Sequence, residues 1–471
     1  MGSRMSSKRF PAASAGAWLI AYAACSFPKP ADVPQCVSST DCTSAGSPIC
    51  VAGSCVAAGA CAVDEDCAGV AGKPYCQTAE GSCVGCLDGS SCPTSMPVCD
   101  ATSHSCQACD RDDQCPSGVC VDAEGRCALD NEVVFLRSLN SADNPTCSAA
   151  APCQNFPAAL AATTAQRYIV HILGGSFAMN AGVELPGRRL YVDGSDTIVS
   201  SVQGATFSSS AASLNITLGR MTIGAVSGSA IVVSGTGALQ LEKVTLTAPV
   251  TITGGSLEVR ASALGRVTCS GGGTLDIERS TVTTPDDSNG LPIIESTNCT
   301  LTLRADQFFS DGAGLLETGG GKITVMNNVF VGTIPSTDPL GFSSPLSGSR
   351  FAFNTVVNFS GLDGTATVIN CDSSLDVSSN IFAWNSSARL SACIIHDSLF
   401  DDFVPASALG SNHQASSLAI FLDFNAKDLH LSPTSPALGL GEPGITDVDL
   451  AGHPRPSPAG TRPDVGAYES P

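Results

Sequence analysis

Residues 275–283 read LDIERSTVT, residues 301–309 read LTLRADQFF, and residues 323–331 read ITVMNNVFV. The three stretches share one nine-residue pattern, with apolar residues at the first, third and eighth positions and a small or turn-forming residue at the sixth. Alternating apolar and polar residues are typical of β-strands, whose side chains point to opposite faces. One such stretch cannot bury its apolar face alone, so the pattern predicts that copies of it stack.

The pattern recurs nine times, at intervals of 18 to 26 residues. Successive coils stacked about 4.8 Å apart would bury a continuous apolar core, and intervals of this length suit a parallel β-helix. Leucine-rich repeats need an Asn and Leu framework that is missing here, and propeller blades are longer. We therefore predict an all-β solenoid in which the first positions are Leu214, Leu239, Leu257, Leu275, Leu301, Ile323, Ser349, Leu375 and Cys393.

Two further columns of the pattern support stacking in register, so that Ile277, Leu303 and Val325 should lie above one another. The sixth column contains residues that favour tight turns and that could hydrogen-bond from coil to coil: Ser262, Ser280, Asp306, Asn328, Asn354, Asn380 and Ser398. The fourth column alternates in charge and predicts an exposed ladder of ion pairs, each contributing about 0–1 kcal/mol: Glu242, Arg260, Glu278 and Arg304.

The ends of a solenoid need covering, because an open coil exposes core and unpaired strand edges. We expect a cap helix at about 154–165 (QNFPAALAATTA), with Cys147 and Cys153 stapling the loop before it. Two other pairs of cysteines are about one coil apart and are expected to crosslink neighbouring coils: Cys269 with Cys299, and Cys371 with Cys393.

Residues 36–130 form a separate cysteine-rich module of four repeats with four Cys each, and every repeat opens with C-x5-C. A repeat of about 22 residues cannot build a sufficient core, so we expect two disulfides in each repeat, with a connectivity that the spacing leaves open. Zinc is the disfavoured alternative, because structural zinc sites favour C-x2-C spacing. The cysteines are Cys36, Cys42, Cys50, Cys55; Cys61, Cys67, Cys76, Cys83; Cys86, Cys92, Cys99, Cys106; and Cys109, Cys115, Cys120, Cys127.

The N-terminus has the features of a secretory signal peptide over residues 1–24, with basic residues before a short apolar run. The end of the run resembles a bacterial lipobox, which predicts lipidation at Cys25, and a Pro-rich tether follows over 25–35. Ordinary cleavage after small residues is the alternative. The protein is therefore expected to be exported, as an outer-membrane or cell-surface lipoprotein or as a secreted protein, with membrane attachment only through Cys25.

The net charge of −20 argues against nucleic acid or an anionic membrane surface as a partner, because both would repel the chain. Acidic clusters such as residues 64–66 could hold Ca²⁺, but they lack the spacing of a calcium loop. A solvated acidic surface is the favoured interpretation. We therefore predict no metal site and no cofactor, with Ca²⁺ as the minority alternative.

The tail 464–469 (DVGAYE) and the coil stretches NNVF at 327–330 and SNIF at 379–382 resemble bacterial right-handed parallel β-helix repeat proteins of the pectate-lyase-like superfamily. The resemblance implies a right-handed β-helix over 131–471 with a closing cap segment at about 429–471. Five charged residues are interpreted as ion pairs holding that cap, with Ca²⁺ at the first two as the alternative: Asp447, Asp449, Arg455, Asp464 and Glu469. The superfamily contains polysaccharide lyases, hydrolases and epimerases, along with surface proteins of no known activity.

The catalytic motifs of these enzymes are missing from the sequence, and only two Trp are present to supply a carbohydrate platform. The densest titratable set, His396, Asp397, Asp401 and Asp402, is the first candidate for a catalytic site, with a structural role favoured. We predict a non-catalytic surface protein that presents a β-helix on a disulfide-rich stalk and contacts an extracellular glycan or protein. The alternatives are a polysaccharide lyase or glycoside hydrolase, and a purely structural envelope component.

Overall fold

The computed structural model describes residues 36–37, 41–43, 49–51, 54–56, 60–137, 146–211, 215–283, 291–310, 314–332, 340–359, 369–371, 374–384, 393–401 and 411–470. The predicted signal peptide, Cys25 and the Pro-rich tether lie outside these residues. The chain forms two compact units. The first comprises Met1–Pro93 with Val98–Gln107, and the second comprises Thr94–Pro97 with Ala108–Pro471.

Each cysteine-rich repeat is a short antiparallel hairpin held by two disulfides. The first Cys of a repeat joins the third and the second joins the fourth, as in Cys61–Cys76 and Cys67–Cys83. All four repeats follow this connectivity. The hairpins are β1 (Ile49–Val51) with β2 (Ser54–Val56), β3 (Tyr75–Gln77) with β4 (Ser82–Val84), β5 (Val98–Cys99) with β6 (Cys106–Gln107), and β7 (Cys120–Val121) with β8 (Arg126–Cys127). Single 3-10 turns accompany them: η2 (Asp64–Cys67), η3 (Gly89–Ser91), η4 (Asp112–Gln114), η5 (Asp122–Glu124) and η6 (Asp130–Glu132).

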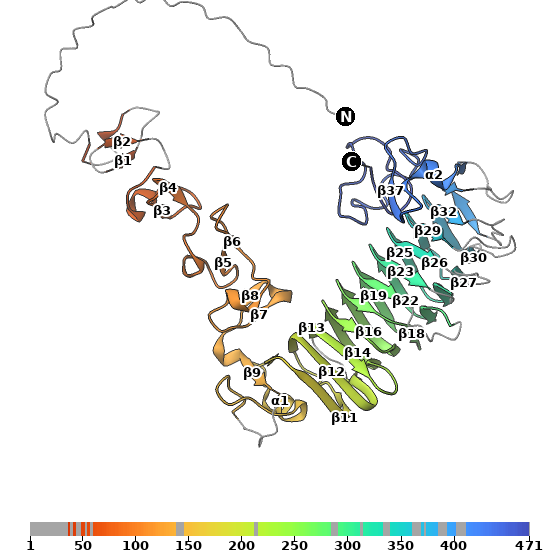
Figure 1. The fold of residues 1–471 in the computed structure, drawn as a ribbon, viewed down its shortest axis with the longest axis horizontal. Helices are drawn as coiled ribbons and strands as arrows, with labels where there is room; N and C mark the ends of the chain where they lie inside the picture. Colours follow the sequence, from red (N-terminus) through yellow and green to blue (C-terminus); the bar gives the residue numbers. More distant parts are fainter. Residues whose placement is uncertain are drawn as a thin grey trace, which may run out of the picture. The chain divides into compact units, whose positions relative to one another are not determined.

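The second unit is a parallel β-helix, which confirms the predicted fold (Figure 1). Its coils wind through three parallel sheets. Sheet 1 contains β9 (Val133–Leu136), β10 (Ile169–Ile172), parts of β12 (Leu190–Ser209), β13 (Ile216–Ala225), β14 (Ile231–Glu242) and β16 (Val250–Arg260), then β19 (Thr274–Glu278), β22 (Thr300–Arg304), β25 (Ile323–Met326), β28 (Ser349–Ala352), β31 (Leu375–Ser378) and β33 (Ile394–His396).

Sheets 2 and 3 complete each coil. Sheet 2 contains β11 (Ser176–Glu184), parts of β12 and β13, β15 (Thr245–Leu246), β17 (Ala263–Leu264), β20 (Thr281–Thr283), β23 (Gln307–Ser310), β26 (Val329–Gly332), β29 (Thr355–Asn358), β32 (Ile381–Trp384), β34 (Leu399–Phe400) and β35 (His413–Gln414). Sheet 3 contains the remaining parts of β11, β12, β14 and β16, then β18 (Val267–Ser270), β21 (Ile294–Thr297), β24 (Leu316–Gly319), β27 (Leu340–Ser343) and β30 (Ile369–Cys371).

The predicted register holds through the middle of the solenoid, where Ile277 pairs with Leu303 and Leu303 with Val325 in parallel strands. The prediction was wrong by two residues at the first unit, because Leu218, not Ile216, pairs with Leu241. A shift of two residues keeps the same side chains on the buried face, so alternation alone could not distinguish the two registers. The disulfides Cys269–Cys299 and Cys371–Cys393 join successive coils.

The sixth column forms a buried ladder of hydrogen bonds along the core. Backbone N–H groups donate to the side chain one coil further on, as from Asp306 to Asn328 Oδ1 (2.8 Å) and from Asn328 to Asn354 Oδ1 (3.0 Å). The left-handed backbone conformation lies at the residue before, for example at Ala305 and Asn327. The sixth side chain therefore points into the turn, and the fifth residue makes the bend.

The N-terminal end of the β-helix is covered by α1 (Phe156–Ala162), which is shorter than the predicted helix. Asn155 caps the helix by accepting a hydrogen bond from the Ala158 N–H (2.8 Å). Phe156 packs edge-on against Phe177 and Phe207 inside the first coils. The preceding loop carries the Cys147–Cys153 disulfide, so both ends of the loop are tied where the core begins.

The fourth cysteine-rich repeat belongs to the β-helix unit, although its sequence groups it with the other three. Val119 and Val121 are buried against Phe135, Tyr168 and Tyr191 of the first coils. The repeat therefore covers the outer face of sheet 1 at its N-terminal end.

The C-terminal segment folds back over the outer face of sheet 2. From β26 onward that face is apolar, and Val357 and Ile381 are buried against Phe421, Leu429 and Val465. The segment includes α2 (Ser417–Ile420) and the antiparallel pair β36 (Phe421–Asp423) and β37 (Asp428–Leu431). None of the described helices is long and apolar enough to span a membrane.

Inside the C-terminal segment, Arg455 is the central charge. Its guanidinium lies 3.3 Å from Glu469, with both side chains fully buried, and 4.4 Å from the centre of the Phe353 ring. Asp449 and Asp464 instead accept backbone N–H groups, such as those of Glu469 (2.9 Å) and Gly439 (2.7 Å). Among the five charged residues expected to hold the cap, only Arg455 and Glu469 form an ion pair with each other in the described structure, and carboxylate–backbone hydrogen bonds supply the other contacts.

Candidate functional site

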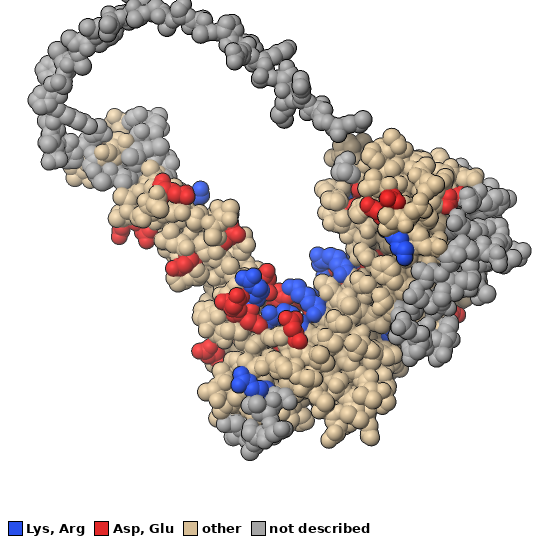
Figure 2. All heavy atoms as spheres, in the orientation of Figure 1, with Lys and Arg blue, Asp and Glu red and all other residues tan. Residues whose placement is uncertain are grey.

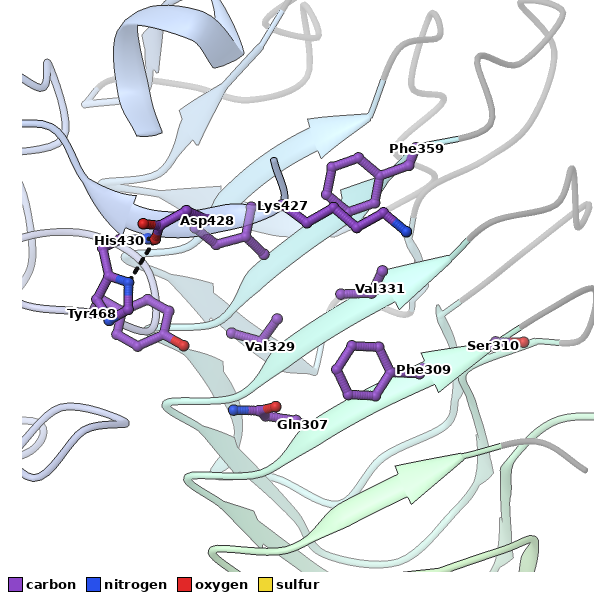
Figure 3. Close-up of a pocket in the computed structure, with 11 residues that line it drawn as sticks. Gln307, Phe309, Ser310, Val329, Val331, Phe359, Lys427, Asp428, His430 and Tyr468 are labelled. Atoms are coloured by element: carbon purple, nitrogen blue, oxygen red, sulfur yellow. Dashed lines mark hydrogen bonds and ion pairs between the residues drawn. The ribbon is translucent and has the colours of Figure 1, made fainter. Parts of the chain in front are cut away.

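A pocket of about 330 Å³ opens where the exposed part of sheet 2 meets the C-terminal segment (Figure 3). Strands β23 and β26 supply its floor, and residues 427–430 of the C-terminal segment supply one wall. The lining residues are Gln307, Phe309, Ser310, Val329, Val331, Phe359, Lys427, Asp428, Leu429, His430 and Tyr468.

The floor lies where the outer face of sheet 2 changes from open to covered. Phe309 on β23 is 38% exposed, whereas Val331, which pairs with it on the next strand, is 5% exposed because the C-terminal segment covers it. In the preceding coil the outward position in register with Phe309 is Thr283, and the neighbouring outward positions in register with Gln307 are Thr281 and Ala263, all polar or small. An exposed Phe at this boundary therefore presents an aromatic surface at the mouth of the pocket.

The wall carries the polar groups. His430 Nδ1 lies 2.7 Å from Asp428 Oδ1, and the His430 ring packs on Tyr468 with ring centres 4.3 Å apart. The hydrogen bond from His430 lowers the pKa of the Asp428 carboxyl, and burial raises the pKa of the Tyr468 phenol. Asp428 is therefore a charged acceptor and Tyr468 a neutral donor at neutral pH.

A cation completes the rim of the pocket. Lys427 Nζ lies 5.4 Å from the centre of the Phe359 ring, and no ion pair of Lys427 occurs among the described residues. Aromatic surfaces combined with a few convergent hydrogen-bonding groups are typical of small-molecule and carbohydrate sites. The pocket can thus offer ring stacking and hydrogen bonds to one ligand.

The structure places the predicted candidate His396 in a network of ion pairs on sheet 1. His396 Nε2 lies 2.9 Å from Asp376 Oδ1, and its Nδ1 lies 3.0 Å from Asp397 Oδ2. Arg350 pairs with Asp376 (2.8 Å), and Arg462 of the C-terminal segment pairs with Asp397 (3.2 Å). This network ties the last coils to the C-terminal segment.

The chemistry of His396 follows from those contacts. Partial burial opposes its charge, but the hydrogen bonds to Asp397 and Asp376 prevail and raise the pKa of His396. Both ring nitrogens are engaged, so the imidazole has no free nitrogen to act as a base. These contacts favour the structural role.

Asp401, another predicted member, does not join this set. Asp401 is buried and accepts a hydrogen bond from the Ser417 N–H at the start of α2 (2.7 Å), together with one from the Ser417 hydroxyl. Asp402 lies outside the described residues. Asp401 thus stabilises a helix N-terminus and does not face His396 in any described contact.

A second buried charge network lies where the fourth repeat meets the β-helix. Arg220 donates to Asp193 Oδ1 (2.8 Å) and Oδ2 (2.6 Å) and to Asp112 (2.7 Å), and His171 Nδ1 lies 2.7 Å from Asp193. In Figure 2, side chains of both signs gather at this junction, whereas much of the visible β-helix surface is uncharged. The guanidinium already satisfies both carboxylates, so the network is structural.

Carboxylates for a metal are not brought together elsewhere in the described part of the chain. Besides disulfide-bonded cysteines, only Asp112, His171 and Asp193 place three ligand atoms within 4.8 Å of one another there. On the outer face of sheet 1, Arg260 pairs with Glu278 (2.8 Å), as the ladder predicts, but Arg304 pairs with Asp276 (3.2 Å). These acids are therefore interleaved with arginines.

The sequence did not single out the residues of the pocket as a site. They come from five separated stretches, and only the final fold brings them together. Tyr468 lies within the motif DVGAYE and His430 within the predicted cap segment, and both features indicated the fold and gave no sign of a site. An available signal was the apolar Phe309 at an outward position that is polar in the preceding coil, at Thr283.

Comparison with known proteins adds little about function. A family of unknown function (DUF8331) matches residues 27–133, which cover most of the predicted tether and the four cysteine-rich repeats. Among solved structures, a pectate lyase, Pel9A, is similar at 14% sequence identity and a TM-score of 0.42, over 72% of this chain and 96% of that chain. No curated protein matches the sequence.

Proposed function

We propose that this chain is an exported surface protein whose β-helix binds a glycan in the pocket beside β23 and β37, without cleaving it. The observation that carries the proposal is the exposed Phe309 facing a wall of hydrogen-bonding groups. A sugar ring stacks on such an aromatic face through its C–H groups, while its hydroxyls bond to neighbouring polar side chains. Gln307, Asp428 and His430 supply both donors and acceptors for those hydroxyls.

The non-catalytic part of the proposal rests on the charges near the pocket. Glycoside hydrolysis needs two carboxyl groups flanking the bond, and calcium-assisted elimination needs carboxylates around a cation with a base beside them. Among the described lining residues Asp428 is the single carboxylate, and it is hydrogen-bonded to His430. The lining residues therefore support binding of a glycan better than its cleavage.

The export part of the proposal rests on the cysteines. Every cysteine in the described residues is in a disulfide, which is typical of an oxidising compartment. With the signal-like N-terminus, this supports secretion followed by lipidation at Cys25. Mass spectrometry of the mature protein should find the N-terminus at Cys25 with a diacylglycerol adduct, which Cys25→Ser abolishes. A mature chain beginning elsewhere would contradict lipidation, and an unprocessed cytosolic chain would contradict export.

A glycan array combined with an activity screen tests the binding proposal. The full-length mature protein should bind a defined set of glycans, and Phe309→Ala should weaken that binding about two- to tenfold, as expected for one lost stacking contact. Leu422→Ala removes an equally apolar side chain, 58% exposed, from outside the pocket and should leave binding unchanged.

Two outcomes would overturn this proposal. Equal binding by wild type and Phe309→Ala would move the ligand away from the pocket. Release of oligosaccharides from uronic-acid or neutral polymers by the wild type, retained in Phe309→Ala with unchanged rates, would show an enzyme acting at another site.

A further inference from the structure

The hydrogen-bond ladder inside the β-helix has a repeated geometry at its asparagines. Each amide uses Oδ1 to accept the backbone N–H of the preceding coil and Nδ2 to donate to a backbone carbonyl of that coil. The Nδ2 donors reach the carbonyls of the third pattern position: Asn328 to Leu303 (3.0 Å), Asn354 to Val325 (3.0 Å) and Asn380 to Phe351 (2.9 Å).

Asp306 occupies the same position one coil earlier. Its Oδ1 accepts the Ser280 N–H (2.8 Å), as an asparagine Oδ1 would. Its Oδ2 replaces the amide nitrogen, is buried, and has no hydrogen-bond partner when treated as an acceptor. By the pattern of the three asparagines, the group that faces this atom is the carbonyl of Ile277, which is also an acceptor.

Among the described residues, no cation pairs with the Asp306 carboxyl. The charged groups on the flanking strands are Asp276, Glu278 and Arg279 around β19 and Arg304 on β22. Arg304 is engaged by Asp276 (3.2 Å) and Arg279 by Glu278 (3.6 Å) on the outside of the sheet. On the following coil the neighbours are Met326, Asn327 and Asn328, which are uncharged. An ionised carboxylate here would be buried without a counterion, which is strongly unfavourable.

We infer that Asp306 is a neutral carboxylic acid in the folded protein and donates its Oδ2–H to the Ile277 carbonyl, so that the β-helix folds with one bound proton. A neutral acid with one hydroxyl donor and one carbonyl acceptor reproduces the hydrogen-bonding pattern of the asparagine amide. The electrostatics point the same way, because burial raises the pKa of Asp306 well above its ordinary value and outweighs the lowering by the backbone N–H groups of Ser280 and Arg304.

The bound proton makes the stability of the β-helix depend on pH. The unfolded chain releases this proton above the ordinary pKa of an aspartate, about 3.9. Between that pH and the raised pKa of the folded state, the folded state holds more protons, so stability falls as pH rises. The contribution is fully present below about pH 4 and is lost once the pH passes the folded pKa of Asp306.

The test compares urea unfolding of full-length wild type and Asp306→Asn between about pH 4 and pH 9, followed by far-ultraviolet circular dichroism. The two proteins should be similarly stable at the acid end. As the pH rises, wild type should lose stability relative to Asp306→Asn. The ratio of their unfolding equilibrium constants should change by up to tenfold per pH unit, and the change should level off at the pKa of Asp306 in the folded state. A stability difference that is constant, or that shrinks as pH rises, would overturn the inference.

Two further measurements keep the inference testable if Asp306→Asn does not fold. Asn354→Asp places a second acid in the ladder and should add the same pH dependence to the wild-type curve. Infrared spectroscopy at neutral pH should also show the carbonyl band of a protonated carboxyl group in wild type. An absent band in wild type, or a pH-independent effect of Asn354→Asp, would show that acids in the ladder are ionised.

Discussion

Asn354 illustrates how one buried side chain supports two coils. Its Oδ1 accepts the N–H of Asn328 (3.0 Å) and its Nδ2 donates to the Val325 carbonyl (3.0 Å). Asn354→Ala leaves both groups without this partner, and each orphaned group costs about 1–3 kcal/mol, so the free energy of unfolding should fall by about 2–6 kcal/mol. Denaturant unfolding measures this loss.

The exposed Asn425 offers a matched control. Asn425→Ala removes the same side chain from the surface and should change the free energy of unfolding by less than about 0.5 kcal/mol. Equal effects of the two substitutions would mean that the ladder does not stabilise the core.

At the residue scale, the sequence predicted the hydrogen-bond ladder but not the protonation state of Asp306 within it. The column of Ser, Asp and Asn was visible because these side chains recur at one position of the repeat. The neutral state inferred for Asp306 depends on which carbonyl faces it and on the absence of a nearby free cation. Both depend on coil register, which the pattern alone does not determine to within two residues.

At the scale of elements, His396 is expected to stabilise the contact between the last coils and the C-terminal segment. The contacts with Asp376 and Asp397 raise the pKa of His396, so the folded state favours its charged form. Its stabilising contribution should be fully present below the ordinary histidine pKa of about 6.5 and should be lost as pH rises through the raised value.

The variant His396→Ala should therefore be less stable than wild type at about pH 5, by no more than about 1 kcal/mol because the network is one-third exposed, and the gap should close at alkaline pH. Thermal unfolding across this range provides the measurement. Leu422→Ala, which removes an exposed side chain that does not titrate, is the control and should show no such pH dependence. A stability difference between wild type and His396→Ala that grows as the pH rises would contradict this role of His396.

The pocket shows why a sequence that predicts the fold can fail to predict the site. Strand β23 follows the repeat pattern, but β37 and residue Tyr468 belong to the C-terminal segment, which we expected to act as a cap. The structure instead lays that segment along sheet 2 because Val331, Val357 and Ile381 make the outer face apolar. Those outward apolar residues were present in the sequence, but the pattern accounted only for the inward ones.

At the scale of the whole molecule, the fourth cysteine-rich repeat is a cap of the β-helix. Arg220 holds the repeat through Asp112 and is paired with Asp193, whose side chain is fully buried. Removing one partner of a buried ion pair costs about 3–5 kcal/mol, because the remaining charge loses its compensation. Arg220→Met should therefore lower the melting temperature and should expose the repeat to proteolysis.

Arg111→Met is the matched control in the same repeat. Arg111 and Asp113 form an ion pair with both side chains mostly exposed, so its loss should cost less than about 1 kcal/mol. Comparable destabilisation by both variants would mean that the fourth repeat does not depend on the buried network. The sequence grouped this repeat with the first three because all four share a similar cysteine spacing. The contacts of the fourth repeat with the β-helix are made by other side chains and do not change that spacing.

The central functional claim concerns where the ligand lies, and a co-crystal structure with the best-binding oligosaccharide from the array tests it most directly. We predict a sugar ring stacked on Phe309, with its hydroxyls within hydrogen-bond distance of Asp428, His430 or Gln307. Electron density for the sugar elsewhere, such as over the Arg and Glu side chains on the outer face of sheet 1, with the pocket free of ligand, would contradict the account.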